Sequence, residues 1–486
     1  MPTVTSLSNN VLNDLDQAII VPHYDRSALR PSIVHIGVGG FHRAHLATYV
    51  DELCRAGNTS WAIVGAGTQP SDKAVADALD SQDRLYTLMV RDDERTDLHV
   101  VGSIVDYVRA FDQPQLLVDR IADATTQIVS LTVTEGGYPV DDQDGAYLAT
   151  SKNAGPTSAF GILAQGLEER RLNSRAPITI LSCDNIMSNG DVTQAAINGE
   201  AARFGEELLS WIETSVAFPN SMVDRITPAT TPAHIAWLRE HHQLDDKWPV
   251  VTEPFRQWVI EDRFAGERPP LEELDILVTD DVEPYEIMKL RLLNASHSCL
   301  AYPAALFGIE HVHTALEDAD IDRFVRELLA EEAVPALPDV PGIDIDAYVA
   351  SLTTRFANPA IADQIARLCQ DGSSKFPKFL LPTIEAQLAM DGPIDRSTLA
   401  LASWCEYLAQ DGIEGSAITA APDPRMTAAA SFAAASLRNP SAFLEFDDVF
   451  PASLATSDRF VQSFTTSLGS IRAVGLRATL IEIANR

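Results

Sequence analysis

A glycine-rich turn near the N-terminus constrains the fold more than any other feature of this chain. Residues 32–36 form a short apolar stretch typical of a buried strand, and Gly37-Val38-Gly39-Gly40 follows it directly. Residues 41–55 have a helical pattern, and residues 61–67 form a second strand-like stretch. Glycines between a strand and a helix let the backbone turn tightly and approach a pyrophosphate, which the helix N-terminus then stabilises. The order strand, turn, helix, strand therefore predicts a dinucleotide-binding βαβ unit.

The rest of the chain divides into a strand-containing part and a helical part. Further strand-like segments alternate with helical patterns or loops at residues 100–105, 128–134, 178–183, 222–226, 250–252 and 276–278. That alternation predicts an α/β fold with a parallel, doubly wound sheet. From Pro284 onward, Ala- and Leu-rich helical patterns dominate and no strand pattern is convincing. At 486 residues two domains are expected: a Rossmann-type domain over residues 1–286 and a mostly α-helical domain over residues 287–486.

The glycine motif departs from the usual dinucleotide pattern in two places. His42 stands where GxGxxG has its third glycine, and no acidic residue closes the second strand. Asp72, slightly later, is the nearest candidate to bind the ribose hydroxyls, so NAD is expected and NADP stays open. His42 and His45 are one helical turn apart, but two histidines without further ligands favour a structural or cofactor-packing role over a metal. Arg43 is a candidate cation for the phosphates. The candidate cofactor residues are Gly37, Gly39, Gly40, Phe41, His42, Arg43 and Asp72.

Charge and cysteine content exclude several classes of function. Asp and Glu number 69 against 36 Lys and Arg, which gives a net charge of -33. A field of that sign repels nucleic acid and anionic lipid, so neither is an expected partner. The five cysteines are scattered without a CxxC pair, the N-terminus lacks a basic signal-peptide region, and no apolar run reaches about 18 residues. These observations indicate the reducing cytoplasm.

The residues after Pro284 hold the most informative polar group. At about 100° per residue of a regular helix, Lys289, Asn294 and His297 fall within a sector of about 140°. The simplest interpretation of these three residues is a solvated helix face. The alternative is an alcohol-oxidising site, which needs a base and hydrogen-bond donors that stabilise an alkoxide. A desolvated lysine can be the base, and an asparagine amide can be the donor. No credible Cys/His zinc set is present. Residues 134–138 and 182–185 are polar clusters at strand ends, where open α/β sheets place their sites.

Several stretches together carry a family resemblance. They are IVHIGVGGFHRAH (33–45), IVSLTVTEGGY (128–138), SCDNIMSNG (182–190), MVDRITP (222–228), WPVVTEPFRQWVIEDRF (248–264), the K-x4-N-x2-H pattern (289–297) and DGSSKFPKFLLPTI (371–384). In this order the sequence resembles the long-chain, zinc-independent polyol dehydrogenase family, most closely its mannitol-oxidising branch. The resemblance extends from about residue 33 to beyond residue 425 and so covers nearly the whole chain.

The resemblance implies a fold, a reaction and site residues. It implies a Rossmann-type domain, a helical domain and a cleft between them, with metal-free interconversion of D-mannitol and D-fructose by hydride transfer to NAD. It further implies that Lys289 is the general acid/base and that the amides of Asn185 and Asn294 hold the reacting oxygen. His297 would orient the substrate, and Glu135 would assist proton exchange with solvent. Arg367 and Lys375 would bind further substrate hydroxyls. Arg367 could instead pair with a surface carboxylate.

Three alternatives stay open at this point. D-arabinitol 4-dehydrogenase and the fructuronate or tagaturonate reductases belong to the same family, although an acidic surface disfavours an anionic uronate. Ser71 stands where mannitol-oxidising members can carry a second acid, which weakens a strict NAD preference. A non-catalytic nucleotide-binding sensor is the alternative from another class, and the presence of Lys289, Asn294 and His297 disfavours it. The expected partner is a small polyol or ketose, and the sequence leaves the oligomeric state open.

Overall fold

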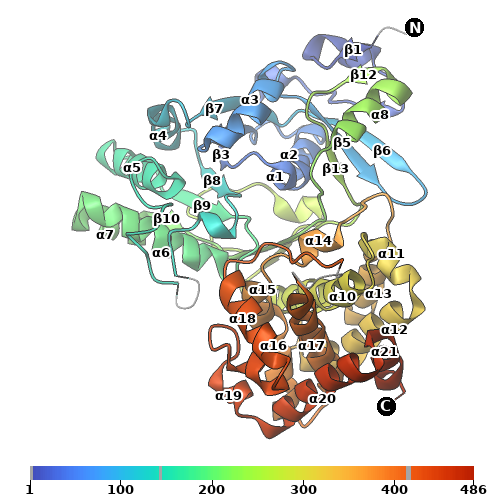
Figure 1. Cartoon of the computed structure of the whole chain (residues 1–486). Coiled ribbons are helices and arrows are strands. Elements are labelled where there is room, and N and C mark those ends of the chain that lie inside the picture. Colours follow the sequence, from blue (N-terminus) through green and yellow to red (C-terminus); the bar gives the residue numbers. More distant parts are fainter. Residues whose placement is uncertain (1–3, 142–144, 412–416, 486) are drawn as a thin grey trace. The chain divides into compact units, whose positions relative to one another are not determined.

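The computed structural model describes residues 4–141, 145–411 and 417–485 of the chain (Figure 1). It divides into two compact units, residues 1–283 and residues 284–486. The division expected after residue 286 lies inside helix α9 (Glu283–Lys289), close to the boundary between the units. Each unit has its own elements and its own buried core, and each is described by itself.

A six-stranded sheet forms the centre of the N-terminal unit (Figure 1). Its order is β10-β9-β8-β3-β4-β7, and all neighbours pair in parallel. The strands are Val216–Ala217, Ile178–Ser182, Ile128–Leu131, Ile33–Ile36, Ile63–Gly67 and Ile104–Arg109. From β3 the chain first runs outward through β4 to β7 and then returns to β8, β9 and β10 on the other side. This reversal confirms the expected doubly wound sheet and creates a switch point between β3 and β8.

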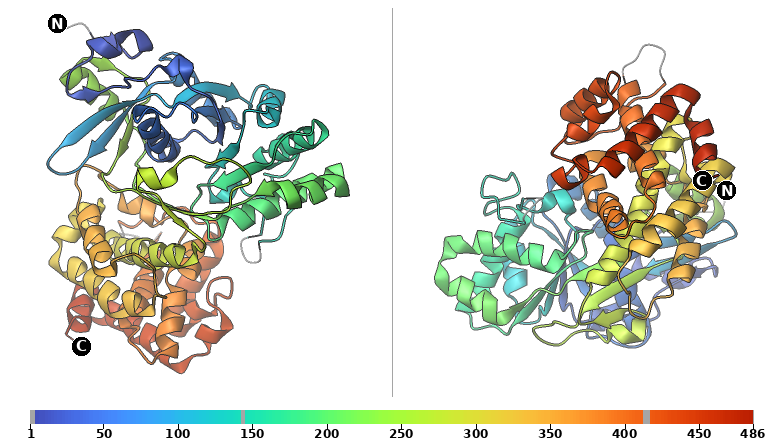
Figure 2. Two further views of the ribbon diagram at one scale, coloured as in Figure 1. Left: turned by 180° about the vertical axis from the view of Figure 1, so that it is seen from behind. Right: turned by 90° about the horizontal axis from the view of Figure 1, so that it is seen from below.

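Successive residues of β3 show why the sheet is covered on both faces. Ile33 belongs to the core formed with α2 (Leu46–Arg55) and α3 (Lys73–Asp80), whereas Val34 and Ile36 belong to a second core. Four helices supply that second core: α4 (Pro114–Ala122), α5 (Ala159–Leu172), α6 (Asn189–Ala201) and α7 (Glu206–Ser215). Helices α5, α6 and α7 lie side by side next to β8–β10 in Figures 1 and 2. A strand buried on both faces has the continuous apolar sequence seen here.

Smaller sheets take up several strands that the sequence assigned to the main sheet. A four-stranded sheet has the order β13-β5-β6-β2, a three-stranded sheet the order β11-β14-β15, and β1 pairs with β12. The strands of the four-stranded sheet are β13 (Val250–Thr252), β5 (Tyr86–Arg91), β6 (Thr96–Val101) and β2 (Ile19–Ile20). Those of the three-stranded sheet are β11 (Ser221–Asp224), β14 (Gln257–Glu261) and β15 (Leu277–Thr279). The remaining pair is β1 (Thr5–Ser6) and β12 (Leu244–Asp245). Residues 222–226, 250–252 and 276–278 therefore contain strands outside the doubly wound sheet, because composition predicts a strand without specifying its partner.

The single strand expected over residues 100–105 is wrong. Strand β6 ends at Val101, and β7 begins at Ile104 in a different sheet. The chain crosses from one sheet to the other at Gly102, where a Cβ atom would lie 2.9 Å from the Tyr24 hydroxyl oxygen. A side chain at this position would crowd the Tyr24 hydroxyl, so glycine lets the chain cross here without displacing it.

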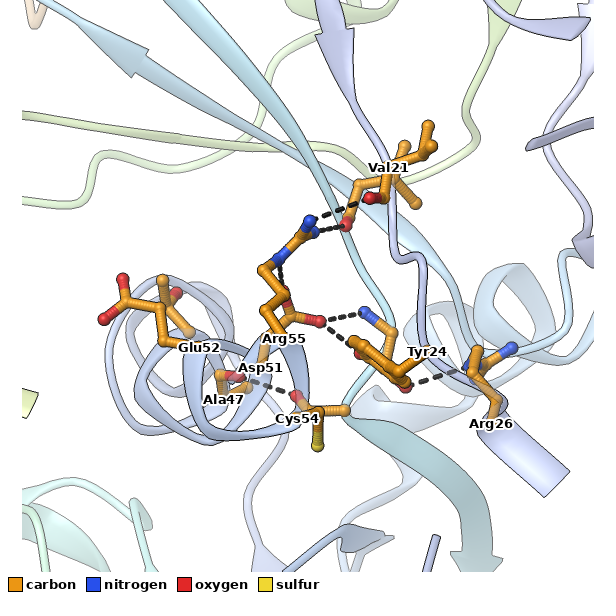
Figure 3. Close-up of polar contacts among 12 residues, drawn as sticks. Val21, Tyr24, Arg26, Ala47, Asp51, Glu52, Cys54 and Arg55 are labelled. Atoms are coloured by element: carbon orange, nitrogen blue, oxygen red, sulfur yellow. Dashed lines mark hydrogen bonds and ion pairs between the residues drawn. The ribbon is translucent and has the colours of Figure 1, made fainter. Parts of the chain in front are cut away.

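A buried polar network holds this crossing in place (Figure 3). Asp51 of α2 accepts hydrogen bonds from the Tyr24 hydroxyl, from Gly102 N–H at 2.8 Å and from Arg55 Nε at 2.5 Å. The Arg55 guanidinium also donates to Val21 O at 2.8 Å. A charged carboxylate buried among three donors is satisfied, so the network attaches the N-terminal segment to α2 and to the β6–β7 connection.

The C-terminal unit is helical over its described residues, which include no strand longer than an isolated bridge between His311 and Gln364. Its central helices α10 (Ala295–Leu306) and α17 (Asp395–Gln410) pack on each other, and Trp404 of α17 is fully buried. The other helices are α11 (Val312–Glu317), α12 (Ala319–Glu327), α13 (Ile345–Phe356), α14 (Ile365–Leu368), α15 (Gly372–Phe379), α16 (Leu381–Ala389), α18 (Met426–Ser436), α19 (Ala452–Ala455), α20 (Asp458–Val474) and α21 (Leu476–Ile483). In the described ranges of both units, no helix has the length and apolarity needed to cross a bilayer.

Candidate active site

The glycine turn lies at the carboxyl end of β3, beside the switch point of the sheet. Gly37 has φ +95°, and a Cβ atom there would lie 2.1 Å from Thr132 O, so only glycine fits. Gly39 differs, because no described atom lies within 4 Å of the Cβ position, and it immediately precedes helix α1 (Gly40–Ala44). Gly40 has only an ordinary contact, 3.5 Å from Thr227 Cγ2. The turn therefore fits a dinucleotide, with Gly37 required for the bend and Gly39 leaving room for a phosphate.

The His42 side chain packs inside the N-terminal unit. This is a structural role, which the sequence allowed beside cofactor packing. Its ring stacks on His35 with centroids 3.4 Å apart, and neither of its ring nitrogens has a hydrogen-bond partner among the described residues. His35 in turn contacts Ser130 Oγ at 2.8 Å and Thr132 Oγ1 at 2.9 Å. Burial lowers the pKa of His35 to about 3 and lowers the pKa of His42 well below its usual value, so both rings are neutral at physiological pH. The ring pair supports the glycine turn from within the protein.

The neighbouring aromatic residues also pack inward. Phe41 is half-buried and stacks on His45, with ring centroids 4.9 Å apart. His45 is fully buried, and its Nε2 contacts Gln257 O at 3.1 Å. His42 and His45 thus have separate partners despite their one-turn spacing. The role of Phe41 toward a cofactor stays a prediction.

Arg43, the candidate cation for the phosphates, packs inside the N-terminal unit. Its side chain is almost completely buried, and its Nη1 donates to Trp248 O at 2.5 Å. The guanidinium lies over the Tyr86 ring at 5.3 Å, and the Tyr86 hydroxyl donates to Arg43 O at 2.6 Å. Its Nε also donates to Gly39 O at 3.3 Å, so Arg43 contacts the glycine turn, and its contact with a cofactor phosphate stays a prediction. The contacts with Trp248 and Tyr86 hold α1 against its neighbours.

Asp72 lies close to the carboxyl end of β4. It ends the short helix η3 (Pro70–Asp72), and its Oδ2 accepts a hydrogen bond from Gln69 N–H at 2.9 Å. A Cβ atom on Gly67, the last residue of β4, would lie 2.7 Å from Asp72 Cβ. The carboxylate thus stands beside the strand end where dinucleotide-binding folds hold the adenosine ribose. Binding of the ribose by Asp72 stays a prediction.

Two further predicted residues follow neighbouring strands of the main sheet. Glu135 begins the short helix η4 (Glu135–Gly137) after β8 and is exposed, whereas Asn185 follows β9 and is half-buried. Asp184, beside Asn185, is a residue that the sequence reasoning missed as a site residue. Burial raises the pKa of Asp184 to about 6. Its position in the polar cluster 182–185 was the available signal, but the sequence could not show that its side chain points back toward the loop after β8.

The helix that carries Lys289 is not the continuous α-helix assumed for the sector of about 140°. Helix α9 ends at Lys289, a π-helical turn η7 spans Leu290–Asn294, and α10 begins at Ala295. In a π turn the hydrogen bonds join residues five apart, so Lys289 and Asn294 are brought closer to alignment than in a regular α-helix. Single π turns inside helices are frequent at functional sites.

The side chains around this turn are buried or nearly so. Lys289 is 7% exposed and His297 is 9% exposed, and the His297 ring stacks on Phe356 with centroids 4.0 Å apart. The Asn294 Oδ1 atom is buried and has no hydrogen-bond partner among the described residues. The three polar groups are therefore not on a solvated helix face, which excludes the simpler interpretation of the K-x4-N-x2-H pattern.

Arg367 and Lys375 lie near one another in the C-terminal unit. Arg367 of α14 donates from Nε to Asp363 Oδ1 at 2.7 Å, and its side chain is 57% exposed. Lys375 of α15 donates from Nζ to Leu368 O at 3.1 Å. Arg367 thus has the carboxylate partner that the sequence allowed as an alternative. Contact of either cation with substrate stays a prediction.

The candidate residues form two groups, one in each unit. The glycine turn, Asp72, Glu135 and Asn185 lie at the carboxyl ends of adjacent parallel strands in the N-terminal unit. Lys289, Asn294 and His297 lie on the helix interrupted by the π turn in the C-terminal unit. In the part of the chain that the structure describes, no three His, Cys, Asp or Glu residues are arranged to hold a metal ion.

Comparison with known proteins identifies the family. Residues 31–273 match the mannitol dehydrogenase Rossmann domain, and residues 281–472 match the mannitol dehydrogenase C-terminal domain. The chain is 40% identical to the mannitol 2-dehydrogenase of Phaeosphaeria nodorum, with 99% of this chain and 86% of that protein covered. It is 41% identical to that of Aspergillus terreus, with 95% and 94% covered.

Solved structures agree over the whole length. The ternary complex of Pseudomonas fluorescens mannitol 2-dehydrogenase with NAD and D-mannitol has a TM-score of 0.90 at 40% identity and covers 99% of this chain and 100% of that chain. A D-sorbitol dehydrogenase in substrate-free form has a TM-score of 0.87 at 32% identity, with 98% and 100% covered. Both domain matches and the full-length similarity lead to one conclusion: the chain belongs to the mannitol dehydrogenase family.

Proposed function

We propose that this chain is a cytoplasmic, NAD-dependent mannitol 2-dehydrogenase, which interconverts D-mannitol and D-fructose. The observation that carries the proposal is the similarity, over 99% of the chain, to an enzyme whose structure contains NAD and D-mannitol. The buried group of Lys289, Asn294 and His297 supports it, because these are the side-chain types that metal-free alcohol oxidation needs.

The N-terminal unit would hold the dinucleotide at the end of β3. The backbone from Gly37 to Gly40 would approach the pyrophosphate, and Asp72 would accept hydrogen bonds from the ribose hydroxyls. A phosphate on that ribose would meet the negative charge of Asp72, which favours NAD over NADP. Bound NAD would supply the acceptor for the hydride that leaves the alcohol carbon.

The C-terminal unit would manage the proton and the reacting oxygen. Lys289 would accept the hydroxyl proton during oxidation, because a lysine amine can exist without its proton whereas arginine cannot. The amide N–H groups of Asn294 and Asn185 would donate to the oxygen as negative charge develops on it. An acceptor buried without a donor costs about 1–3 kcal/mol. A substrate hydroxyl that donates to Asn294 Oδ1 would therefore satisfy the buried atom and bind at the same time.

The remaining residues would orient the substrate and exchange the proton. His297, fixed by its stacking on Phe356, would orient the polyol. Glu135 is exposed, so it can exchange a proton with solvent on behalf of Lys289. Arg367 and Lys375 would contact further hydroxyls. Because Arg367 already pairs with Asp363, a neutral polyol suits this region better than a uronate, whose carboxylate would compete with Asp363.

A spectrophotometric panel at the absorbance of NADH tests this function. NADH and NADPH are offered separately with fructose, xylulose, fructuronate and tagaturonate, and NAD is offered with D-mannitol and D-sorbitol. We expect the highest kcat/KM with NADH and fructose, and with D-mannitol in the oxidative direction. Faster reduction of a uronate or of xylulose, or faster oxidation of D-sorbitol, would contradict the proposed substrate. Absence of turnover throughout would favour the nucleotide-binding sensor instead.

A further inference from the structure

The carboxyl ends of β8 and β9 leave the main sheet side by side. The two strands pair in parallel with Leu131 opposite Ser182, and the pairing continues where Cys183 N–H donates to Leu131 O at 2.9 Å. The loop after β8 carries Glu135, and the loop after β9 carries Asn185. Two residues with proposed roles in one reaction therefore lie on adjacent loops of one sheet.

Asp184 joins these two loops. Its buried carboxylate accepts hydrogen bonds from Val133 N–H at 3.0 Å, from Thr134 N–H at 2.8 Å and from the Tyr138 hydroxyl at 2.8 Å. The Tyr138 hydroxyl also lies 2.7 Å from Ser182 Oγ. All three donors to the carboxylate belong to the loop after β8, whereas Asp184 belongs to the loop after β9. The three hydrogen bonds are therefore cross-links between the loops.

The backbone at Thr134 depends on such a restraint. Thr134 has φ 65° and ψ 159°, a region that glycine alone occupies without strain, and a β-branched residue there is an outlier. Two successive N–H groups that donate to one carboxylate make charge-assisted bonds, which are stronger than those to a neutral acceptor. Glu135 follows Thr134 directly, so this restrained conformation sets the direction in which Glu135 leaves the sheet.

From these contacts, and resting on the function proposed above, we propose that Asp184 is a positioning residue that fixes Glu135 and Asn185 relative to one another. Asp184 acts through the backbone of the loop after β8 and does not touch the substrate. Burial raises its pKa to about 6 even with three donors present, so folding by itself disfavours this charged group. A group kept at such a cost to stability is expected at functional sites.

The replacement Asp184→Asn tests the proposal, because it keeps the size but turns one acceptor oxygen into a donor that faces an N–H group. We expect kcat for fructose reduction to fall by about 10- to 100-fold, since small misplacements of reacting groups have effects of this size. The KM for NADH should stay within threefold of the wild-type value. Hydrogen exchange at the amides of residues 133–135 should become faster.

Asp246→Asn is the matched control. Asp246 is also buried in the N-terminal unit, and its carboxylate accepts hydrogen bonds from Thr87 N–H at 2.5 Å and from Trp248 N–H at 2.8 Å. The replacement removes the same kind of bond away from both loops. We expect near-wild-type kcat and unchanged exchange at residues 133–135. A loss of kcat equal to that of Asp184→Asn would show general destabilisation and overturn the proposal, as would unchanged exchange in Asp184→Asn.

A rescue variant separates positioning from a purely structural role. Thr134→Gly in the Asp184→Asn background should restore part of kcat, because glycine adopts the Thr134 conformation without restraint. No recovery would contradict the proposed route through Thr134. If Asp184→Asn does not fold, Tyr138→Phe removes one donor only and should give a smaller loss of kcat with faster exchange. Wild-type kcat and exchange in that variant would overturn the proposal.

The failure of this inference is distinguishable from the failure of the proposed function. A wild-type enzyme without turnover on D-mannitol and fructose would contradict the function and, with it, the positioning of Glu135 and Asn185 for that reaction. The exchange comparison between Asp184→Asn and Asp246→Asn does not depend on turnover. It decides by itself whether Asp184 holds the loop after β8.

Discussion

Individual buried polar side chains are the features of this protein that packing alone does not explain. Lys289 and His297 are nearly inaccessible on a helix whose neighbours, such as Leu292 and Leu293, are apolar. Burying polar groups costs free energy unless a bonding partner compensates for the lost water. Lys289 and His297 therefore lie inside the C-terminal unit rather than on a solvated helix face.

Replacing Lys289 with alanine should remove the general acid/base. We expect kcat to fall by about 10²- to 10⁴-fold, the usual contribution of such a group, while the Kd for NADH changes less than threefold. Steady-state kinetics and fluorescence titration with NADH measure the two quantities. Lys378→Ala, in the same unit but with an exposed side chain, serves as the control and should keep wild-type kcat. Near-normal kcat in Lys289→Ala would show that another group moves the proton.

Replacing Asn185 or Asn294 with alanine should weaken stabilisation of the developing alkoxide. Loss of one such donor typically lowers kcat by about 10²- to 10³-fold. If both amides act on the same oxygen, the double variant should lose less than the product of the two single losses, because groups that act as a unit are not additive. Steady-state kcat of the two single variants and the double variant measures this. Strictly multiplicative losses would indicate that the two amides act on different atoms.

Two short elements determine where the candidate groups lie, and both depart from regular geometry. The turn after β3 contains a glycine at φ +95°, and the helix after Pro284 contains the π turn Leu290–Asn294. Each irregularity changes the direction of the residues that follow it. Functional groups that must converge from neighbouring positions are often arranged in this way.

The glycine turn offers a matched pair of alanine variants. Gly37→Ala places a Cβ atom 2.1 Å from Thr132 O at a positive φ, so it should lower the unfolding temperature of the protein. Gly39→Ala meets no described atom within 4 Å and has φ -80°, so the fold should be retained. We expect Gly39→Ala instead to weaken NADH binding by about tenfold, because its methyl group occupies space that the pyrophosphate needs.

Calorimetry and NADH titration distinguish the two effects. An unfolding temperature equal to that of the wild type in Gly37→Ala would contradict the steric argument at Thr132. Unchanged NADH affinity in Gly39→Ala would place the dinucleotide away from this turn.

At the scale of the whole molecule, the strong net negative charge sets the field that a bound anion meets. The net charge is -33, and arginine supplies 30 of the 36 basic residues, six being lysine. Arginines such as Arg109, which lies 2.7 Å from Asp77 and 2.6 Å from Asp80, neutralise part of the acidic surface. A positive field for a bound anion must therefore be local, and backbone N–H groups at a helix N-terminus are one source of such a field.

The contribution of the buried histidines to stability should fall on acidification below pH 6.5. Burial lowers the pKa of both His35 and His45 to about 3, whereas the unfolded chain has a value near 6.5. Between these values the unfolded state binds protons that the folded state excludes, so the stabilisation present above pH 6.5 is lost as pH falls toward 3. The loss amounts to about 2 kcal/mol for each ring at pH 5.

Denaturant unfolding at pH 5, 6 and 7 measures this dependence. His45→Phe keeps an aromatic ring between Phe41 and Trp258 but removes one titrating group, so the pH dependence should become weaker by about 1.4 kcal/mol per pH unit. A pH dependence in His45→Phe equal to that of the wild type would contradict the neutral state of the buried His45 ring.

Local patterns in the sequence predicted much of the fold and of the candidate site. Hydrophobic period and composition predicted the strand, the glycine turn and the helix near residue 37. They also predicted the helical character after Pro284. These features depend on neighbours within a few residues, so local sequence is enough to indicate them. The parallel, doubly wound sheet followed from the alternation of strand and helix patterns. The motifs that carry the family resemblance also identified Lys289, Asn294 and His297.

Tertiary structure decided the features that depend on partners distant in the sequence. The separation of β6 from β7, the burial of Arg43 and the cross-links made by Asp184 all require contacts between segments tens of residues apart. The π turn at Leu290–Asn294 also escaped the sequence, because a helical period does not distinguish an α turn from a single π turn. The sequence by itself thus determined the fold class and the kinds of chemical group, since these follow from local pattern. Only the tertiary structure decided where those groups point, because long-range packing sets side-chain direction and burial.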